Sequence, residues 1–177
     1  SLLYGLNSSG KSSLLRALGT NLILAQGGFF VSAEEFTFSP FTKLLTKIAS
    51  SDNLFRGQST FILEMCELKE ILIKSDINSL ILCDELTAGT ETQSATGIVA
   101  SAMTHLLDKK SNFVFTTHLH GIMQFPEIVD HKYLNIFHFN ITIDGEKIVY
   151  DRVLKNGSGD SKYGIEIANA MGLDKNF

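Results

Sequence analysis

One eight-residue stretch near the start of the chain constrains the fold more than any other feature. Residues 5–12 read GLNSSGKS and fit the pattern G-x-x-x-x-G-K-[ST], which forms phosphate-binding loops. Such a loop needs a strand before it and a helix after it. Leu2 to Tyr4 is apolar like the end of a strand, and from Ser13 to Gln26 leucines recur every three or four residues. This context disfavours the alternative, a glycine-containing turn with an exposed lysine.

The composition is that of an ordinary folded domain. The chain has 177 residues, of which 44% are hydrophobic and 19% charged, with a net charge of −4. This charge argues against a large nucleic-acid footprint on residues 1–177 themselves, although other parts of a longer protein could supply one. Cys66 and Cys83 lie in apolar surroundings, so we expect buried thiols in a reducing, intracellular compartment. No apolar run approaches the roughly 18 residues of a membrane span, so no membrane partner is expected.

The pattern along the chain predicts strands that alternate with helices. A hairpin is predicted over residues 134–153, turning at Asp144-Gly145. Further strands are expected at 29–38, 43–48, 79–85 and 112–118, and further helices at 60–74, 93–107 and 163–171. The alternation indicates an α/β fold with a largely parallel sheet. Because the strand that feeds the loop needs neighbours, we expect the domain's N-terminal strands to lie before residue 1, in a larger protein.

The loop residues carry a specific chemistry. Glycines let successive backbone N–H groups turn inward toward a polyphosphate, and the helix that follows adds its positive N-terminal end. Lys11 would reach the β- and γ-phosphates, and Ser12 would offer its hydroxyl to Mg²⁺.

Two carboxylates follow a buried strand. The run SLILCDE ends in Asp84 and Glu85. Asp84 fits a carboxylate that holds Mg²⁺, and Glu85 is placed to polarise a water in line with the γ-phosphate. Two solvated, idle acidic residues are the alternative, which the neighbouring phosphate loop disfavours.

A histidine ends the next apolar strand, in Thr116-Thr117-His118. Strand ends on one side of a parallel sheet converge on the ligand crevice, so His118 could contact the γ-phosphate. A structural role remains the alternative. His118 and His120 also suggest a metal, but no third ligand has suitable spacing for zinc.

With these residues in place, the chain resembles the ATPase domain of the MutS family of DNA mismatch-repair proteins, a branch of the ABC-type ATPases. The resemblance rests on four segments in order: DNLFRGQSTFILEMCE, DELTAGTET, TTHLHGIMQFPE and DSKYGIEIANAMGL. The chain departs from the family's usual loop at Leu6 and Ser8-Ser9, and further on at Ala88 and Glu91. These departures resemble the branch known from giant viruses and octocoral mitochondria.

The resemblance implies a three-layer P-loop fold that binds ATP and Mg²⁺ and hydrolyses ATP. Catalysis would rest on Lys11, Glu85 and His118, with Ser59 supplied in trans by a second MutS-like subunit. Ser12 and Asp84 would hold the metal, and Arg152 would stack on adenine. The residues implied to cradle the phosphates are Gly5, Asn7, Ser8, Ser9, Gly10, Lys11, Ser12 and Ser13. Other domains would bind DNA, the ATP state would switch a DNA-bound clamp, and downstream repair factors are possible partners.

Two other functions stay open. Another ABC-type ATPase, of transport or chromosome maintenance, would share the loop and the acidic pair, but no LSGGQ-like sequence precedes Ser79. A nucleotide-gated dimerisation module would bind ATP and hardly turn it over. Glu85 argues against the module, whereas the altered loop is compatible with it.

Overall fold

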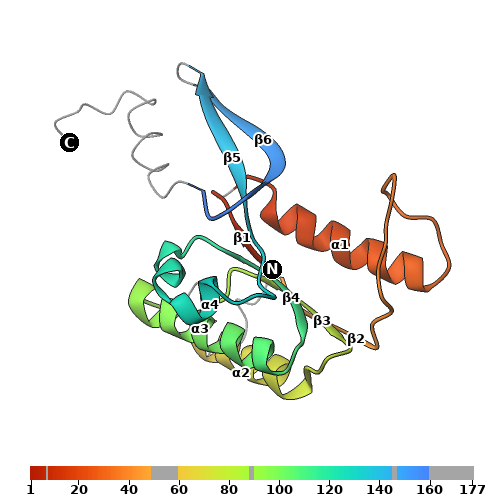
Figure 1. Cartoon of the computed structure of the whole chain (residues 1–177), viewed down its shortest axis with the longest axis horizontal. Coiled ribbons are helices and arrows are strands. Elements are labelled where there is room, and N and C mark those ends of the chain that lie inside the picture. Colours follow the sequence, from red (N-terminus) through yellow and green to blue (C-terminus); the bar gives the residue numbers. More distant parts are fainter. Residues whose placement is uncertain (7, 49–59, 88–89, 145–146, 160–177) are drawn as a thin grey trace.

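The computed structural model describes residues 1–6, 8–48, 60–87, 90–144 and 147–159 (Figure 1). The strands are β1 (Leu2–Tyr4), β2 (Lys43–Lys47), β3 (Ser79–Asp84), β4 (Asn112–Thr117), β5 (Ile136–Asp144) and β6 (Lys147–Asn156). The α-helices are α1 (Lys11–Gln26), α2 (Thr60–Lys74), α3 (Thr92–Asp108) and α4 (Pro126–Val129), and a 3₁₀ helix, η1, spans His120–Gln124.

The described strands form one six-stranded sheet in the order β2-β3-β4-β1-β5-β6. All neighbours pair in parallel except β5 and β6, which form an antiparallel hairpin. The prediction of an α/β fold with a largely parallel sheet and a hairpin near the C-terminus is therefore confirmed. Asp84 pairs with Thr116 across β3 and β4, and Tyr4 pairs with Thr117 across β1 and β4. This register brings the carboxyl ends of three strands to the same edge.

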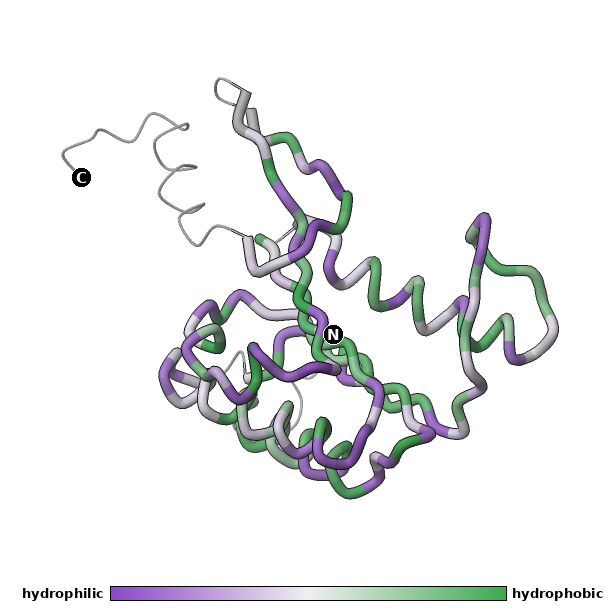
Figure 2. Tube along the Cα trace, viewed as in Figure 1, coloured by the Kyte–Doolittle hydropathy of each residue, from purple (hydrophilic) through white to green (hydrophobic). Residues whose placement is uncertain are grey.

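Helices cover both faces of the sheet, with α1 on one side and α2, α3 and α4 on the other (Figure 1). Side chains of β3 alternate between the two sides, as the pleat of a strand requires. Leu80 and Leu82 pack with Leu15 of α1, whereas Ile81 and Cys83 belong to the cluster under α2 and α3. Figure 2 shows the apolar segments gathered in the strands at the centre. A strand buried on both faces explains why SLILC is continuously apolar.

The predicted strand over residues 29–38 is wrong, because this segment is a loop. After Gly27 ends α1, Phe30 is exposed and Phe36 packs beside Phe38 against the α1 side of the sheet. The chain then returns along α1, where the Gln26 side chain bonds both the N–H and the C=O of Phe41. Here aromatic residues fill a side-chain cluster rather than a ladder, although they have a high strand propensity.

The other boundaries agree with the predictions to within a few residues, and the helix predicted at 163–171 lies outside the described residues. Of the two cysteines expected to be buried, only Cys83 is, and burial raises the pKa of its thiol to about 12. Cys66 is exposed, because α2 turns Leu68 and Ile71 toward the core and Cys66 outward.

Candidate nucleotide-binding site

The loop between β1 and α1 is closed by two glycines. At Gly10 the backbone has a φ of 108°, a left-handed conformation that glycine adopts without strain. At Gly5 an added Cβ would lie 2.7 Å from the Ser9 Oγ and 3.6 Å from the Lys11 Cδ. The loop therefore curls tightly on itself and delivers the chain directly into α1, which begins at Lys11.

The first turn of α1 is suited to an anion. Gly10 precedes the helix, no side-chain hydrogen bond caps its end, and its first turn holds no acidic residue. The first backbone N–H groups of a helix have no partner within the helix, and the helix dipole adds positive potential there. A phosphate group could accept hydrogen bonds from these N–H groups, and the helix dipole would stabilise its negative charge.

The Lys11 side chain folds back from the start of α1 onto the loop, and the residue is only 5% exposed. Its Nζ donates hydrogen bonds to the carbonyl oxygens of Gly5, at 2.8 Å, and Leu6, at 3.0 Å. The same Nζ lies 3.2 Å from the Oε1 of Glu85. The ammonium group is thus already surrounded by oxygens, which any phosphate would have to replace in part.

The acidic pair follows β3. Asp84 is 6% exposed, and its Oδ1 accepts a hydrogen bond of 2.5 Å from the Thr116 hydroxyl. Glu85 has a φ of 46°, in the left-handed region, where a residue other than glycine is uncommon. Its backbone N–H bonds Thr116, and its side chain is 29% exposed. The chain therefore turns at Glu85 and presents this carboxylate toward the loop.

These groups face one hollow of about 360 Å³, a size that fits a small ligand. Its lining comes from the loop, from the first turns of α1 and from the end of β3: Ser8, Gly10, Lys11, Ser12, Ser13, Arg16, Asp84 and Glu85. The sequence reasoning missed Arg16, although its spacing of four residues from Ser12 places both on one face of α1.

Two other predicted site residues, Ser9 and His118, do not line the hollow. Ser9 is buried with its Oγ aimed at Gly5, so its side chain does not line the hollow. His118 is 61% exposed, and its Nδ1 lies 3.9 Å from the Oε1 of Glu85. His118 is therefore near Glu85 but outside the lining.

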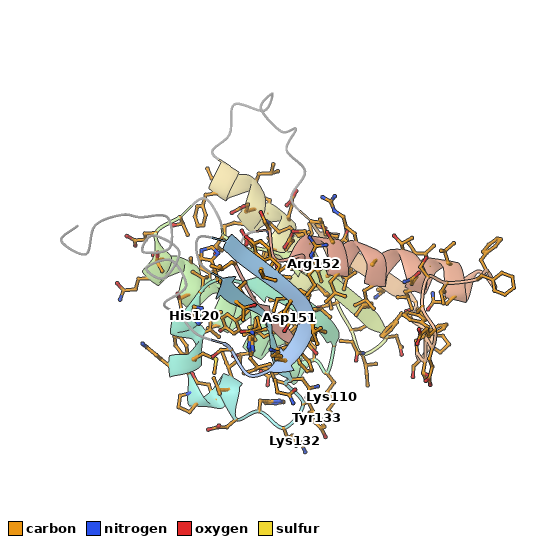
Figure 3. All side chains as sticks on the ribbon, turned by 90° about the horizontal axis from the view of Figure 1, so that it is seen from above. Lys110, His120, Lys132, Tyr133, Asp151 and Arg152 are labelled. Atoms are coloured by element: carbon orange, nitrogen blue, oxygen red, sulfur yellow. The ribbon has the colours of Figure 1, made fainter. Side chains whose placement is uncertain are left out.

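Arg152 is exposed at an irregularity in β6, with a φ of 54° (Figure 3). Arg152 does not line the hollow. Asn7 and Ser59 lie outside the described residues.

The oxygen groups suit Mg²⁺, which prefers carboxylate and hydroxyl oxygens and keeps several waters. Ser12 and Asp84 come from two different elements and line the same hollow. Among the described residues, the hollow included, no group of three or more His, Cys, Asp or Glu side chains could hold a metal.

The family model of MutS domain V matches residues 1–177, and the chain belongs to this family. It is 42% identical over 177 residues to a mitochondrial DNA mismatch repair protein mutS homolog of Sarcophyton glaucum, covering 99% of this chain and 18% of the relative.

Two further relatives are similar. A putative DNA mismatch repair protein mutS homolog of Acanthamoeba polyphaga mimivirus is 38% identical, over 99% of this chain and 16% of the relative. The DNA mismatch repair protein MutS of Alkaliphilus metalliredigens is 35% identical, over 99% of this chain and 20% of the relative. The chain thus spans about a fifth of the length of these relatives. The resemblance to the MutS family, including its mitochondrial and viral members, is confirmed. Among the described residues, no helix is long and apolar enough to cross a membrane.

Proposed function

We propose that the chain is a P-loop ATPase domain of the ABC type, which binds ATP with Mg²⁺ and hydrolyses it. One observation carries the proposal: Lys11, Asp84 and Glu85 converge on one hollow at the N-terminus of α1. A cation, a helix end and two carboxylates with different surroundings are what phosphoryl transfer to water requires. Membership of the MutS domain V family supports the same reading.

In this proposal Lys11 exchanges partners when the nucleotide binds. Its Nζ would leave part of its contact with Gly5, Leu6 and Glu85 for phosphate oxygens. The Glu85 carboxylate, released from the ion pair, would then accept a proton from the attacking water. The loop N–H groups and the end of α1 would stabilise the negative charge on the phosphates. His118, near Glu85, would contact the γ-phosphate.

Ser12 and Asp84 would hold Mg²⁺. When bound, the ion would neutralise charge on the β- and γ-phosphates.

We further propose a role in a larger protein. The relatives are named as DNA mismatch repair proteins and are about five times as long as this chain. The ATP state would control a DNA-bound clamp formed with a second MutS-like subunit, while other domains contact DNA. Ser59 would complete the partner's site, and downstream repair factors would recognise the clamp.

The test is the ATPase rate per chain as a function of protein concentration, with Lys11→Ala as the inactive variant. We expect Lys11→Ala to lower the rate by about 100-fold or more, because it removes a charge that stabilises the transition state. Lys110→Ala, at an exposed lysine away from the hollow, serves as the control and should keep the rate.

A rate that rises with concentration supports the composite site. A rate per chain that is independent of protein concentration but abolished by Lys11→Ala would support hydrolysis within one chain. It would exclude the role of Ser59. A rate unaffected by Lys11→Ala would exclude the proposed function itself.

A nucleotide-gated module with little turnover is the second candidate, and the Lys11–Glu85 ion pair favours it, because it holds the proposed base. Glu85→Gln separates the two. An ATPase should lose turnover by about 100-fold or more and keep its ATP affinity, since Lys11 is freed rather than removed. A module should show little turnover before the substitution and no further loss after it.

A further inference from the structure

A threonine on β4 contacts both acidic residues of the site. Thr116 is 2% exposed and lies opposite Asp84 in the parallel pairing of β3 and β4. Its Oγ1 donates a hydrogen bond of 2.5 Å to the Asp84 Oδ1. The same Oγ1 accepts a hydrogen bond of 3.2 Å from the backbone N–H of Glu85. One buried hydroxyl therefore joins the side chain of one carboxylate residue to the backbone of the other.

We propose that Thr116 is a positioning residue for the metal-binding carboxylate and for the turn that presents Glu85. This inference rests on the proposed function. A hydroxyl has one proton, and here Asp84 receives it. The bond fixes the Oδ1 and leaves the Oδ2 as the oxygen for a cation. Partners of this kind around a ligating carboxylate commonly change metal affinity by 10- to 100-fold.

The choice of threonine has a physical reason. A β-branched side chain has few rotamers in a strand, so its hydroxyl is held in one direction. Serine would keep the hydroxyl with less restriction. Valine keeps the shape and loses both hydrogen bonds of the hydroxyl, so the Glu85 N–H keeps only its 3.3 Å bond to the Thr116 carbonyl oxygen. Valine would leave the buried Oδ1 of Asp84 without its hydrogen-bond donor, so this oxygen would no longer be held in place.

The adjacent Thr117 offers a matched control. It is also buried, but its Oγ1 accepts a hydrogen bond of 3.0 Å from the N–H of Leu119. Thr117 does not line the hollow. Thr117→Val therefore removes one buried hydroxyl from the same strand without touching either acidic residue.

The experiment measures binding rather than turnover. Mn²⁺ replaces Mg²⁺ as a paramagnetic probe, and its dissociation constant for the full 177-residue chain with ATP is measured by electron paramagnetic resonance. ATP affinity is measured separately in EDTA, and thermal unfolding checks the fold. We expect Thr116→Val to weaken Mn²⁺ binding about 10-fold, without a matching loss of ATP affinity in EDTA. Thr116→Ser should recover most of the affinity, and Thr117→Val should retain it.

Unchanged Mn²⁺ affinity in a folded Thr116→Val chain would overturn this inference and leave the proposed function standing. If that variant does not fold, Thr116→Ala takes its place with the same expectation. A wild-type chain that binds ATP but no Mn²⁺ would overturn the inference together with the metal site. A wild-type chain that binds neither would overturn the proposed function as well.

Discussion

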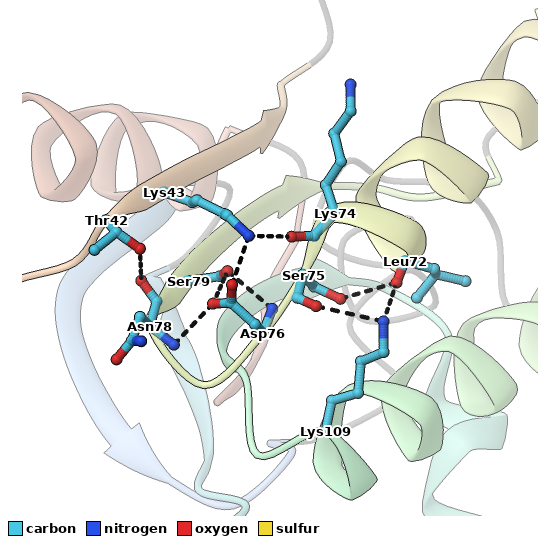
Figure 4. Close-up of polar contacts among 9 residues, drawn as sticks. All are labelled: Thr42, Lys43, Leu72, Lys74, Ser75, Asp76, Asn78, Ser79 and Lys109. Atoms are coloured by element: carbon cyan, nitrogen blue, oxygen red, sulfur yellow. Dashed lines mark hydrogen bonds and ion pairs between the residues drawn. The ribbon is translucent and has the colours of Figure 1, made fainter.

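At the amino ends of the strands Lys109 donates hydrogen bonds to the carbonyl oxygens of Leu72 and Ser75, at 2.5 and 3.3 Å (Figure 4). Lys11, near the carboxyl ends, also contacts two carbonyl oxygens, but it adds a glutamate that borders a hollow. Lys109 caps the C-terminus of α2, where backbone carbonyls lack partners within the helix. Lys11 is held by groups that a ligand could replace.

The surroundings of the two lysines differ in the same way. At the amino ends the Asp76 carboxylate bonds Lys43, Ser79 and the N–H of Asn78, so its capacity is used within the chain (Figure 4). At the carboxyl ends Ser8, Glu85 and Thr87 all have a positive φ, whereas near the amino ends Lys110 has one. Left-handed backbone at such residues costs free energy and is concentrated at functional sites. The contrast indicates that one end of the sheet is organised for stability and the other for binding.

The largest effect on stability should come from a buried ion pair outside the hollow. The Nζ of Lys47, at the end of β2, lies 3.4 Å from the Oε1 of Glu64 in α2. The two side chains are 6% and 16% exposed. Glu64→Ala would leave the buried ammonium unpaired and should lower the free energy of unfolding by about 3 kcal/mol in urea denaturation. Glu67→Ala, at an exposed position on α2, is the control. Equal effects of the two substitutions would contradict a cost set by the buried ion pair.

Lys109→Met tests the amino end directly. It keeps an apolar stem of similar length and removes both hydrogen bonds to the end of α2, so the free energy of unfolding should fall by about 2 kcal/mol. The matched variant is Lys110→Met, at an exposed neighbour, which should stay near wild type. ATP affinity should be unchanged in both. A loss of ATP affinity in folded Lys109→Met would break the division between the two ends.

The smallest effect concerns acid stability. The hydrogen bond from Lys43 and then that from Ser79 hold the pKa of Asp76 below its usual value. Asp76 therefore contributes stability that is complete above the pKa of the unfolded chain and is lost as the pH falls through the lower, folded value. Asp76→Asn should make unfolding less pH-dependent below about pH 4. The comparison is Asp108→Asn, at an exposed aspartate, in thermal unfolding between pH 2 and 7. Parallel pH profiles of wild type and Asp76→Asn would contradict the role of this network.

Local sequence determined most of the elements and the members of the candidate site. The phosphate-loop spacing placed Lys11 and Ser12 directly before a predicted helix, which in the structure begins at Lys11. The apolar run before Asp84 indicated a strand buried on both faces. Such features are readable because spacing and apolar pattern reflect contacts within one element or its turn.

Only the tertiary structure decided which of these side chains meet. The bond from Thr116 to Asp84 depends on β4 lying beside β3 in one register, and the Lys11–Glu85 pair depends on the sheet order that places β1 next to β4. Residues 29–38 form a loop, in which Phe36 and Phe38 pack against the apolar cluster beside α1. Contacts between residues far apart in sequence are set by strand order and register, which local patterns do not encode.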